Sequence, residues 1–444
     1  MKKIILSFLL VFAMTLNAGF CANLKSEINN VITNSGINRG GISVSVKNAQ
    51  TGKVVYELNP KMPVSPASTQ KIITSTPAFI TLGEDYKFST KLYKNDKNEY
   101  LLVLGADPYL RTSELDKIVR CISKEPACIN IDSSIIDNND WGEGWQWDDD
   151  LNPLMPKFSA YNIDRNIMQI VIAPSMNGYP PEVIKEVNYP LTFINNMITS
   201  KETKYKIKRQ NHISPDILVL EGTIRPDKSE IVKIPINNPK KYFTMRLSDC
   251  IINHGISSSG IYNEVKLNKN YQLITLLSHD ISDAKTDIYK NSNNFVCETT
   301  FKIAGGKYTS KTGSFENGMI MFNDFCKKHN IDTSDIKLTD ASGVSKNNLV
   351  TTDFMTSFLL KTRGFLEKNL PTAGEGTLTN RMLYLKGFVY AKTGTLNNIS
   401  AMAGYISTLK RQKYVFSIII NDRCSNGDKK MLEEYILRTI YSKG

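Results

Sequence analysis

The stretch SPASTQKIITSTPAFITLG, residues 65–83, places a serine three residues before a lysine at the start of a predicted helix. Because residues three apart lie on the same face of a helix, we expect the Ser68 hydroxyl and the Lys71 amine to lie within reach of each other. Taken alone, Ser68 would be interpreted as the N-cap of the helix and Lys71 as a surface residue. One S-x-x-K pattern therefore does not decide the function.

Two further short motifs follow the first, one in a predicted loop and one in a predicted strand. They are Ser292-Asn293-Asn294 and Lys392-Thr393-Gly394-Thr395. Each is weak by itself, since Lys392 alone would be interpreted as a lysine at the end of a strand. The ordered set of helix, loop and strand motifs favours nucleophilic catalysis by serine.

The residue types in these motifs suit acyl transfer. A serine hydroxyl attacks a carbonyl only when a base accepts its proton, and Lys71 can do so in its neutral form. Burial beside a second cation such as Lys392 is expected to lower the pKa of Lys71, because desolvation and like charge both disfavour the ammonium. We expect Ser292 to pass a proton to the leaving amine, and Asn294 to hold Lys71 and the substrate amide.

The strand motif offers groups that bind an anion. Lys392, Thr393 and Thr395 at a sheet edge are expected to hold a terminal carboxylate. The backbone N–H groups of Ser68 and Thr395 are expected to form the oxyanion hole, which stabilises the negative charge that develops on the attacked carbonyl.

The tripeptide Lys-Thr-Gly also occurs earlier in the chain, at residues 311–313. There it is followed by Ser314 and an apolar run with helical character, so we predict that Ser314 is a helix N-cap. The later copy ends one strand and turns into another. We therefore predict that Lys392, and not Lys311, binds the carboxylate.

These motifs resemble the D-alanyl-D-alanine carboxypeptidase/endopeptidase family of class C low-molecular-mass penicillin-binding proteins. The resemblance extends to four other stretches, VLGADPYL (103–110), GWQWDDD (144–150), LTDASGVSKNNLVT (338–351) and GTLTNRM (376–382). It implies cleavage of the terminal D-Ala-D-Ala bond or of peptide crosslinks in peptidoglycan, through an acyl-enzyme. It also implies covalent inhibition by β-lactam antibiotics such as penicillins. The expected partners are therefore peptidoglycan stem peptides and crosslinks, together with these antibiotics.

The resemblance also assigns roles to residues, matched position by position. Catalytic roles fall on Ser68, Lys71, Ser292 and Asn294, and substrate-binding roles on Lys392, Thr393, Gly394 and Thr395. Asp149 is similar to the acidic residue that receives the free amine of the substrate's diamino acid, with Asp148 and Asp150 one register away. The alternative is that this segment is a solvated acidic turn flanked by tryptophans.

Both ends of the chain contain predicted strands, as in GISVSVKNAQTGKVVYEL (41–58) and YVFSIIIND (414–422), where apolar residues alternate or cluster. The expected fold class is α+β, a transpeptidase/β-lactamase-like antiparallel sheet flanked by helices. We assign residues 23–83 and 266–444 to this catalytic domain. Residues 84–265, between the first and second motifs, are expected to form a β-rich insertion of two modules.

The N-terminal residues 1–22 place two lysines before an apolar run, which predicts a signal peptide and export, with the periplasm as the expected location. A formal net charge of +12 suits an anionic cell wall or peripheral contact with a membrane surface, whereas nucleic acid is not expected. In an oxidising compartment Cys121 and Cys128 are expected to form a disulfide. No cofactor is expected, and four histidines without ligand spacing predict no metal site. The sequence leaves the oligomeric state open, a homodimer included.

Two other functions use the same fold. A β-lactamase-like hydrolase would share the acylation groups, but it must also hydrolyse the acyl-enzyme quickly. A catalytically silent wall-binding scaffold would keep the fold, but the presence of Ser68, Lys71 and Lys392 argues against it. A Ser-His-Asp hydrolase is disfavoured because the sequence has no G-x-S-x-G elbow.

Overall fold

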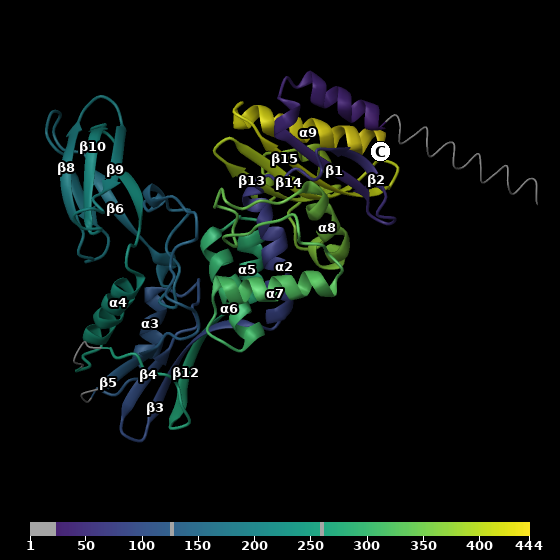
Figure 1. Ribbon diagram of the computed structural model, residues 1–444. Helices are drawn as coiled ribbons and strands as arrows, with labels where there is room; N and C mark the ends of the chain where they lie inside the picture. The colour runs from purple at the N-terminus through teal and green to yellow at the C-terminus, as the bar shows by residue number, and fades with distance from the viewer. Residues whose placement is uncertain (1–23, 125–127, 258–261) are drawn as a thin grey trace, which may run out of the picture. The chain divides into compact units, whose positions relative to one another are not determined.

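The structure is a computed structural model that describes residues 24–124, 128–257 and 262–444 (Figure 1). The predicted signal peptide, residues 1–22, lies outside the described residues. Two compact units are formed. The first consists of the chain up to Ile80, Ala284–Asn293 and Met319–Gly444, and the second of Thr81–Asp283 and Asn294–Gly318. Over the residues that the structure describes, no helix combines the length and apolar character needed to cross a membrane.

A five-stranded antiparallel sheet forms the centre of the first unit, in the order β13-β14-β15-β1-β2. Its strands are β1 Ile42–Asn48, β2 Val54–Leu58, β13 Val389–Leu396, β14 Ile399–Ser407 and β15 Lys413–Asn421. Ile42 of β1 pairs with Ile420 of β15, so segments from the two ends of the chain lie side by side in one sheet. The predicted α+β fold with an antiparallel sheet flanked by helices is confirmed.

Helices that belong wholly or mainly to this unit are residues 24–34, α2 Gln70–Leu82, α5 Ile281–Tyr289, α7 Phe315–Lys328, α8 Thr352–Leu366 and α9 Asn426–Lys443. Short 3-10 helices occur at η1 Arg39–Gly41, η2 Ala67–Thr69, η5 Gly376–Leu378 and η6 Leu383–Leu385. The predicted reactive helix is therefore a 3-10 turn that contains Ser68, followed by α2, which contains Lys71 and continues through Pro77.

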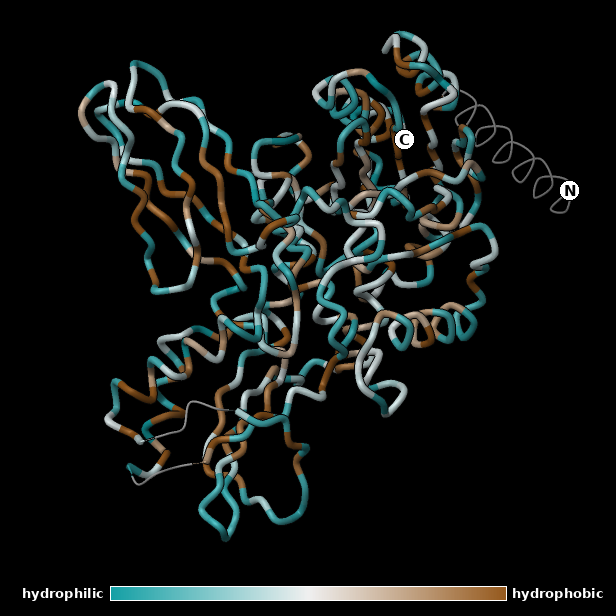
Figure 2. The backbone as a smooth tube through the Cα atoms, turned by 60° about the vertical axis from the view of Figure 1, so that its left-hand side comes forward, coloured by the Kyte–Doolittle hydropathy of each residue, from teal (hydrophilic) through white to brown (hydrophobic). Residues whose placement is uncertain are grey.

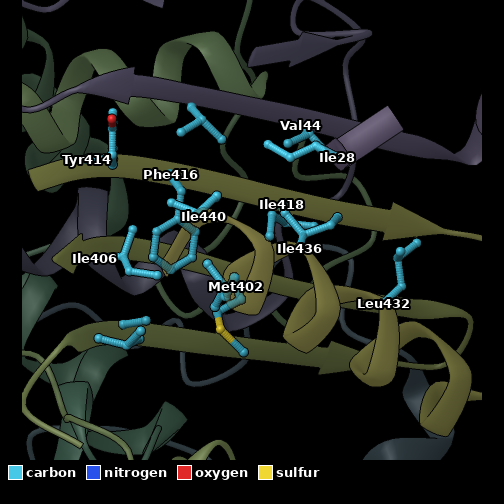
Figure 3. Packing of buried hydrophobic residues seen from close by; sticks show 14 of the residues in the cluster. Ile28, Val44, Met402, Ile406, Tyr414, Phe416, Ile418, Leu432, Ile436 and Ile440 are labelled. Atoms are coloured by element: carbon cyan, nitrogen blue, oxygen red, sulfur yellow. The ribbon is translucent and has the colours of Figure 1, made fainter. Parts of the chain in front are cut away.

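The two faces of β1 differ because successive side chains of a strand point to opposite sides. One face contributes three residues to the buried apolar cluster of the unit: Ile42, Val44 and Val46. Figure 3 shows this cluster between the strands and α9. The other face carries Ser43, whose hydroxyl lies 2.8 Å from that of Thr352 in α8. The sheet is therefore packed between helices on both faces, which fixes the position of β13 at its edge.

The second unit is built from smaller sheets, and their orders are β12-β3-β4-β5, β8-β10-β9 and β11-β6-β7. The strands are β3 Lys87–Asn95, β4 Glu99–Val103, β5 Cys128–Asp132, β6 Ile167–Ala173, β7 Glu182–Lys185, β8 Thr192–Thr199, β9 Lys204–Arg209, β10 Ile217–Ile224, β11 Glu230–Pro235 and β12 Tyr271–Asp280. The helices are α3 Thr112–Val119, η3 Trp147–Asp149, η4 Asp164–Asn166, α4 Pro239–Asn253 and α6 Asn294–Thr309. In Figure 2 brown, hydrophobic stretches follow the strands and teal, hydrophilic stretches follow many of the turns.

The expected disulfide between Cys121 and Cys128 is wrong, because both thiols are free. The sulfur of Cys121 lies 3.6 Å from the carbonyl oxygen of Lys117, and that of Cys128 lies 3.9 Å from Oδ1 of Asn130. Each thiol therefore contacts a group close to it in the chain. Proximity in sequence did not place the two sulfur atoms together.

Candidate active site

The first motif brings a serine hydroxyl and a lysine amine into contact. Nζ of Lys71 donates a hydrogen bond to Oγ of Ser68 at 2.9 Å and a second to the carbonyl oxygen of Ser342 at 2.6 Å. Lys71 is fully buried, whereas Ser68 is half-buried. Ser68 follows Ala67, whose φ of 47° lies in the left-handed region that costs an L-residue energy. A reachable hydroxyl is thus held against a buried amine.

A loop wrapped around one buried carboxylate supplies the second acceptor for Lys71. Asp340 accepts hydrogen bonds from four donors in its own loop, the backbone N–H groups of Gly343, Val344 and Ser345 and the amide of Asn348. The amide of Gln70, next to Lys71 in the chain, also donates to Asp340 at 3.1 Å. This network fixes the loop that presents the carbonyl of Ser342 to Lys71.

Gly343 lets the same loop approach the first motif. Its φ is +80°, and a Cβ built on it would lie 2.0 Å from the carbonyl oxygen of Ala67. Any larger residue would therefore combine backbone strain with a clash against the residue before Ser68. In the sequence, the stretch that contains Asp340, Ser342 and Gly343 is identified by its resemblance to the family, but no role is assigned to these residues.

The second and third motifs contact each other through a hydrogen bond between side chains. Nζ of Lys392 donates to Oγ of Ser292 at 2.8 Å, and it also donates to the backbone carbonyl of Thr393 at 2.9 Å. Lys392 is fully buried on β13, and Ser292 has a φ of 61°. A non-glycine residue in this conformation is strained, which is common where a side chain must be aimed at a functional group.

The strand β13 lies directly against the reactive serine. It forms one edge of the five-stranded sheet, where an extended substrate could pair with it. A Cβ built on Gly394 would lie 2.8 Å from the backbone nitrogen of Ser68 and 3.0 Å from Cβ of Ala67. Gly394 therefore allows an approach that other residues would block. Thr395, the next residue, is exposed on the same strand.

Thr377 is a further residue of this region, in the stretch GTLTNRM (376–382) to which the sequence assigned no role. The hydroxyl of Thr393 donates to the hydroxyl of Thr377 at 2.6 Å. The backbone nitrogen of Thr377 donates to the carbonyl of Lys290 at 3.1 Å, and a Cβ on Gly376 would lie 2.3 Å from that same carbonyl. The turn η5 thus fits between the segment before Ser292 and the strand that carries Thr393.

Two predicted site residues belong to the second unit. Asn294 is the first residue of α6, and its amide donates to the carbonyl of Leu154 at 2.9 Å. Asp149 is half-buried in η3, next to Trp147, which is 78% exposed, whereas Trp145 is buried. Of the neighbouring carboxylates, Asp150 forms an ion pair with Arg209 at 3.1 Å. Asp149 itself stays a prediction as the residue that receives a substrate amine.

The earlier Lys-Thr-Gly copy is placed differently. Ser314 accepts a hydrogen bond from the backbone nitrogen of Asn317 at 3.1 Å, so the prediction that it caps a helix is confirmed for α7. Lys311 is exposed in the second unit, whereas Lys392 is buried in the first. Within residues 24–124, 128–257 and 262–444, no three His, Cys, Asp or Glu side chains are grouped so that they could hold a metal ion.

Known proteins are similar to this chain over nearly its whole length. The sequence profile of the D-Ala-D-Ala carboxypeptidase 3 (S13) family matches residues 24–439. The D-alanyl-D-alanine carboxypeptidase DacB of Haemophilus influenzae is 25% identical over 412 residues, which cover 86% of this chain and 85% of the relative. The D-alanyl-D-alanine carboxypeptidase of Actinomadura sp. is 22% identical over 436 residues, or 90% and 81% of the two chains.

Solved structures with the same fold include that of penicillin binding protein 4 (dacB) from Haemophilus influenzae. It superposes with a TM-score of 0.81 at 21% identity, and the match covers 95% of this chain and 99% of that one. The same protein in complex with a β-lactam gives a TM-score of 0.79 at 20% identity, with 94% and 99% covered. The resemblance that the motifs indicated thus extends to the fold.

Proposed function

The chain belongs to the D-Ala-D-Ala carboxypeptidase 3 (S13) family, and on this premise we propose that it is a serine carboxypeptidase or endopeptidase that cleaves peptidoglycan peptides through an acyl-enzyme on Ser68. The observation that carries the proposal is the contact of 2.9 Å between Nζ of Lys71 and Oγ of Ser68. A buried amine beside a half-exposed hydroxyl is the pairing that activates a serine without histidine.

Acylation follows from this geometry. Neutral Lys71 accepts the proton of Ser68 while Oγ attacks the carbonyl of the penultimate D-Ala, which forms a tetrahedral intermediate. The backbone N–H groups of Ser68 and Thr395 would stabilise its oxyanion. When the intermediate collapses, the C–N bond breaks, and the leaving amine takes a proton through Ser292. Water then attacks the ester on Ser68 and releases the shortened peptide.

Substrate binding is assigned to the strand motif and to the second unit. Lys392 and Thr393 would hold the terminal carboxylate of the D-Ala-D-Ala substrate, supported by charge-assisted hydrogen bonds. For a crosslinked peptide the same groups would hold the equivalent end of the leaving strand. Asp149 would receive the free amine of the diamino acid, as the resemblance of the segment GWQWDDD implies. Asn294 would hold the substrate amide.

Location and partners follow from the same proposal. Residues 1–22 support export to the periplasm, where peptidoglycan peptides are met. We propose that β-lactam antibiotics acylate Ser68, because they place a reactive amide where the substrate amide would lie. Peripheral contact with an anionic envelope surface is supported by the net charge of +12.

The duplicated tripeptide provides a matched pair of variants for testing the proposal. Lys392→Ala should lower kcat/KM for a stem peptide ending in D-Ala-D-Ala by at least about tenfold, which corresponds to about 1.4 kcal/mol of transition-state stabilisation. Lys311→Ala should leave it nearly unchanged, since Lys311 is an exposed residue of the second unit. Release of D-Ala measures both. Equal losses, or a larger loss at Lys311, would show that the carboxylate-binding strand has been assigned to the wrong copy.

A further inference from the structure

A cavity of about 430 Å³ lies in the second unit, and its lining has an excess of positive charge. All of its lining residues belong to that unit. Four of them are cationic: Arg111, Arg165, Lys233 and Arg246. Two are acidic, Asp164 and Glu186. The catalytic mechanism described above uses none of these residues.

One of the two carboxylates is already engaged by the protein. Asp164 accepts hydrogen bonds from the backbone nitrogen and the hydroxyl of Thr112, at 3.0 and 2.5 Å, and from the hydroxyl of Tyr242 at 3.3 Å. Its negative charge therefore lies at the N-terminus of α3, where the helix dipole offsets it. Glu186 is exposed at the cavity, so it can contact a ligand directly.

A strained turn holds one arginine at this cavity. Asp164, Arg165 and Asn166 have φ values of 49°, 57° and 54°, so three successive residues other than glycine are left-handed. Asp and Asn adopt this conformation more readily than other residues. The strain therefore falls mainly on Arg165, where it costs on the order of 1 kcal/mol or more and persists because the surroundings enforce it. Here Asp164 is fixed by Thr112, and the amide of Asn166 donates to the carbonyl of Lys157 at 2.8 Å.

Arg165 lies between these two anchored residues and is exposed. Its guanidinium carbon lies 5.9 Å from the centre of the Tyr109 ring, which also lines the cavity. The hydrogen bonds of the turn thus restrain the backbone on both sides of Arg165 and leave its side chain at the cavity. Strain of this kind is found at binding sites more often than at ordinary turns.

The other cations come from regular elements. Lys233 is in β11, directly opposite Gln169 of β6, and both side chains line the cavity. Arg246 is in α4, where it donates to the hydroxyl of Thr112 at 3.2 Å and pairs with Asp249 at 3.0 Å. Arg111 directly precedes α3. The positively charged side chains therefore come from different helices and strands, whose hydrogen bonds hold the backbone in place. This arrangement pre-organises the side chains for a ligand.

We propose that this cavity binds the carboxylate groups of a peptidoglycan stem peptide, as a second binding site that contains no catalytic residue. Guanidinium groups match carboxylates with paired hydrogen bonds, and a volume of about 430 Å³ is within the range of small-ligand sites. Glu186 adds a negative group that suits the amine of a diamino acid and repels a polymer of phosphates. The substrate class rests on the proposed function.

The experiment uses the full chain and, as a probe, a stem tripeptide that keeps its carboxylates and its diamino acid but lacks the terminal D-Ala-D-Ala. Calorimetry measures its Kd for the wild type and for the double variant Arg165→Asn, Lys233→Gln. Asparagine is chosen because it tolerates a left-handed backbone. We expect the double variant to bind the tripeptide at least about tenfold more weakly, because two charge-assisted contacts are lost.

A matched control removes two positive charges elsewhere in the same unit. Lys204→Gln, Lys206→Gln alters two exposed lysines of β9 that do not line the cavity, and its Kd should equal that of the wild type. Arg111→Gln is an independent variant that should bind several-fold more weakly. Thermal unfolding of each variant checks that it is folded.

Penicillin acylation is measured in parallel and should proceed at the wild-type rate in all these variants. Equal affinity of the wild type and the cavity variants for the tripeptide would overturn the proposal. Tighter binding of inorganic phosphate than of the tripeptide would also overturn it, since the site would then be one for phosphate. Failure of the wild type to be acylated would instead count against the proposed function and leave the binding comparison interpretable.

Discussion

Lys71 donates to Ser68 at 2.9 Å, and the proposed chemistry requires it to accept a proton from the same atom. We predict that Lys71→Arg lowers the rate of acylation by at least about a hundredfold, a typical loss when a general base is removed. Arginine keeps the positive charge but stays protonated, so it cannot act as a base. Single-turnover acylation by penicillin measures this rate. A variant with nearly normal rate would remove Lys71 from the role of base.

Thr377 is a positioning residue, because it acts through the hydroxyl of Thr393. Replacing it by valine keeps the shape and removes the acceptor, so Thr393 loses a neutral hydrogen bond worth about 1 kcal/mol. We predict a several-fold rise in KM for a D-Ala-D-Ala peptide with kcat little changed, because the hydroxyl is assigned to carboxylate binding. Thr377→Ser should restore KM. An unchanged KM in Thr377→Val, or a fall in kcat alone, would contradict this role.

At the scale of elements, two glycines of the first unit have different roles. Gly343 allows two segments to approach closely, whereas Gly364 lies in a helix with open space around it. Gly343→Ala introduces a Cβ at 2.0 Å from the carbonyl oxygen of Ala67 at a φ of +80°, so it should lower the free energy of unfolding by about 1–3 kcal/mol and slow acylation. A Cβ built on Gly364 in α8 meets nothing within 4 Å beyond its chain neighbours and the backbone of its own helix, so Gly364→Ala should raise stability by up to about 1 kcal/mol.

Thermal unfolding and penicillin acylation of both glycine variants provide the measurement. The result that fits the structure is a loss of stability and rate at Gly343 alone. If Gly343→Ala were as stable and as reactive as the wild type, the loop around Asp340 would not be packed against the first motif as described.

Contacts between residues close in the chain could be predicted from the sequence, whereas contacts between distant elements could not. The contact between Ser68 and Lys71 is local, since the two residues are three apart in the chain, where the turn η2 continues into α2. The role of Asp340 depends on a hydrogen bond to Gln70, 270 residues away in the chain, which no short pattern reveals. Thr377 is likewise an ordinary polar residue until β13 is placed beside it. Close spacing, in turn, predicted a Cys121–Cys128 disulfide that the local geometry does not form.

At the scale of the whole molecule, the ordered motifs and the strands at both chain ends predict the α+β fold, because one sheet joins them. No sequence pattern predicted the left-handed turn at residues 164–166, since it contains no glycine. Its conformation is imposed by hydrogen bonds to Thr112 and to Lys157, which lie in other segments. The composition could therefore indicate a β-rich middle region but not the cavity within it.

The stability of the second unit should depend on pH through His279. A hydrogen bond to the Asp107 carboxylate, at 2.7 Å, raises the pKa of His279 above its usual value, despite the opposing effect of burial. Glu114 and Asp283 add attraction to the protonated ring. A raised pKa means that the stabilisation is complete below the unfolded-state value of about 6.5 and is lost as the pH rises through the folded-state value.

We therefore predict that His279→Gln lowers the Tm more at pH 5.5 than at pH 8.5. The control is His212→Gln, because His212 is exposed and should cause little change at either pH. Scanning calorimetry gives the Tm difference from the wild type in each buffer. The same Tm difference at both pH values would mean that the hydrogen bond to Asp107 does not raise the pKa of His279 in the folded protein.

The central claim is that Ser68 is the nucleophile, and covalent labelling tests it most directly. The purified protein is incubated with penicillin, its intact mass is measured, and the modified residue is located by peptide mass spectrometry. We predict a single adduct on Ser68, and no adduct on Ser68→Ala with its thermal transition nearly unchanged. An adduct on another serine, or labelling that persists in Ser68→Ala, would contradict the assignment of the active site.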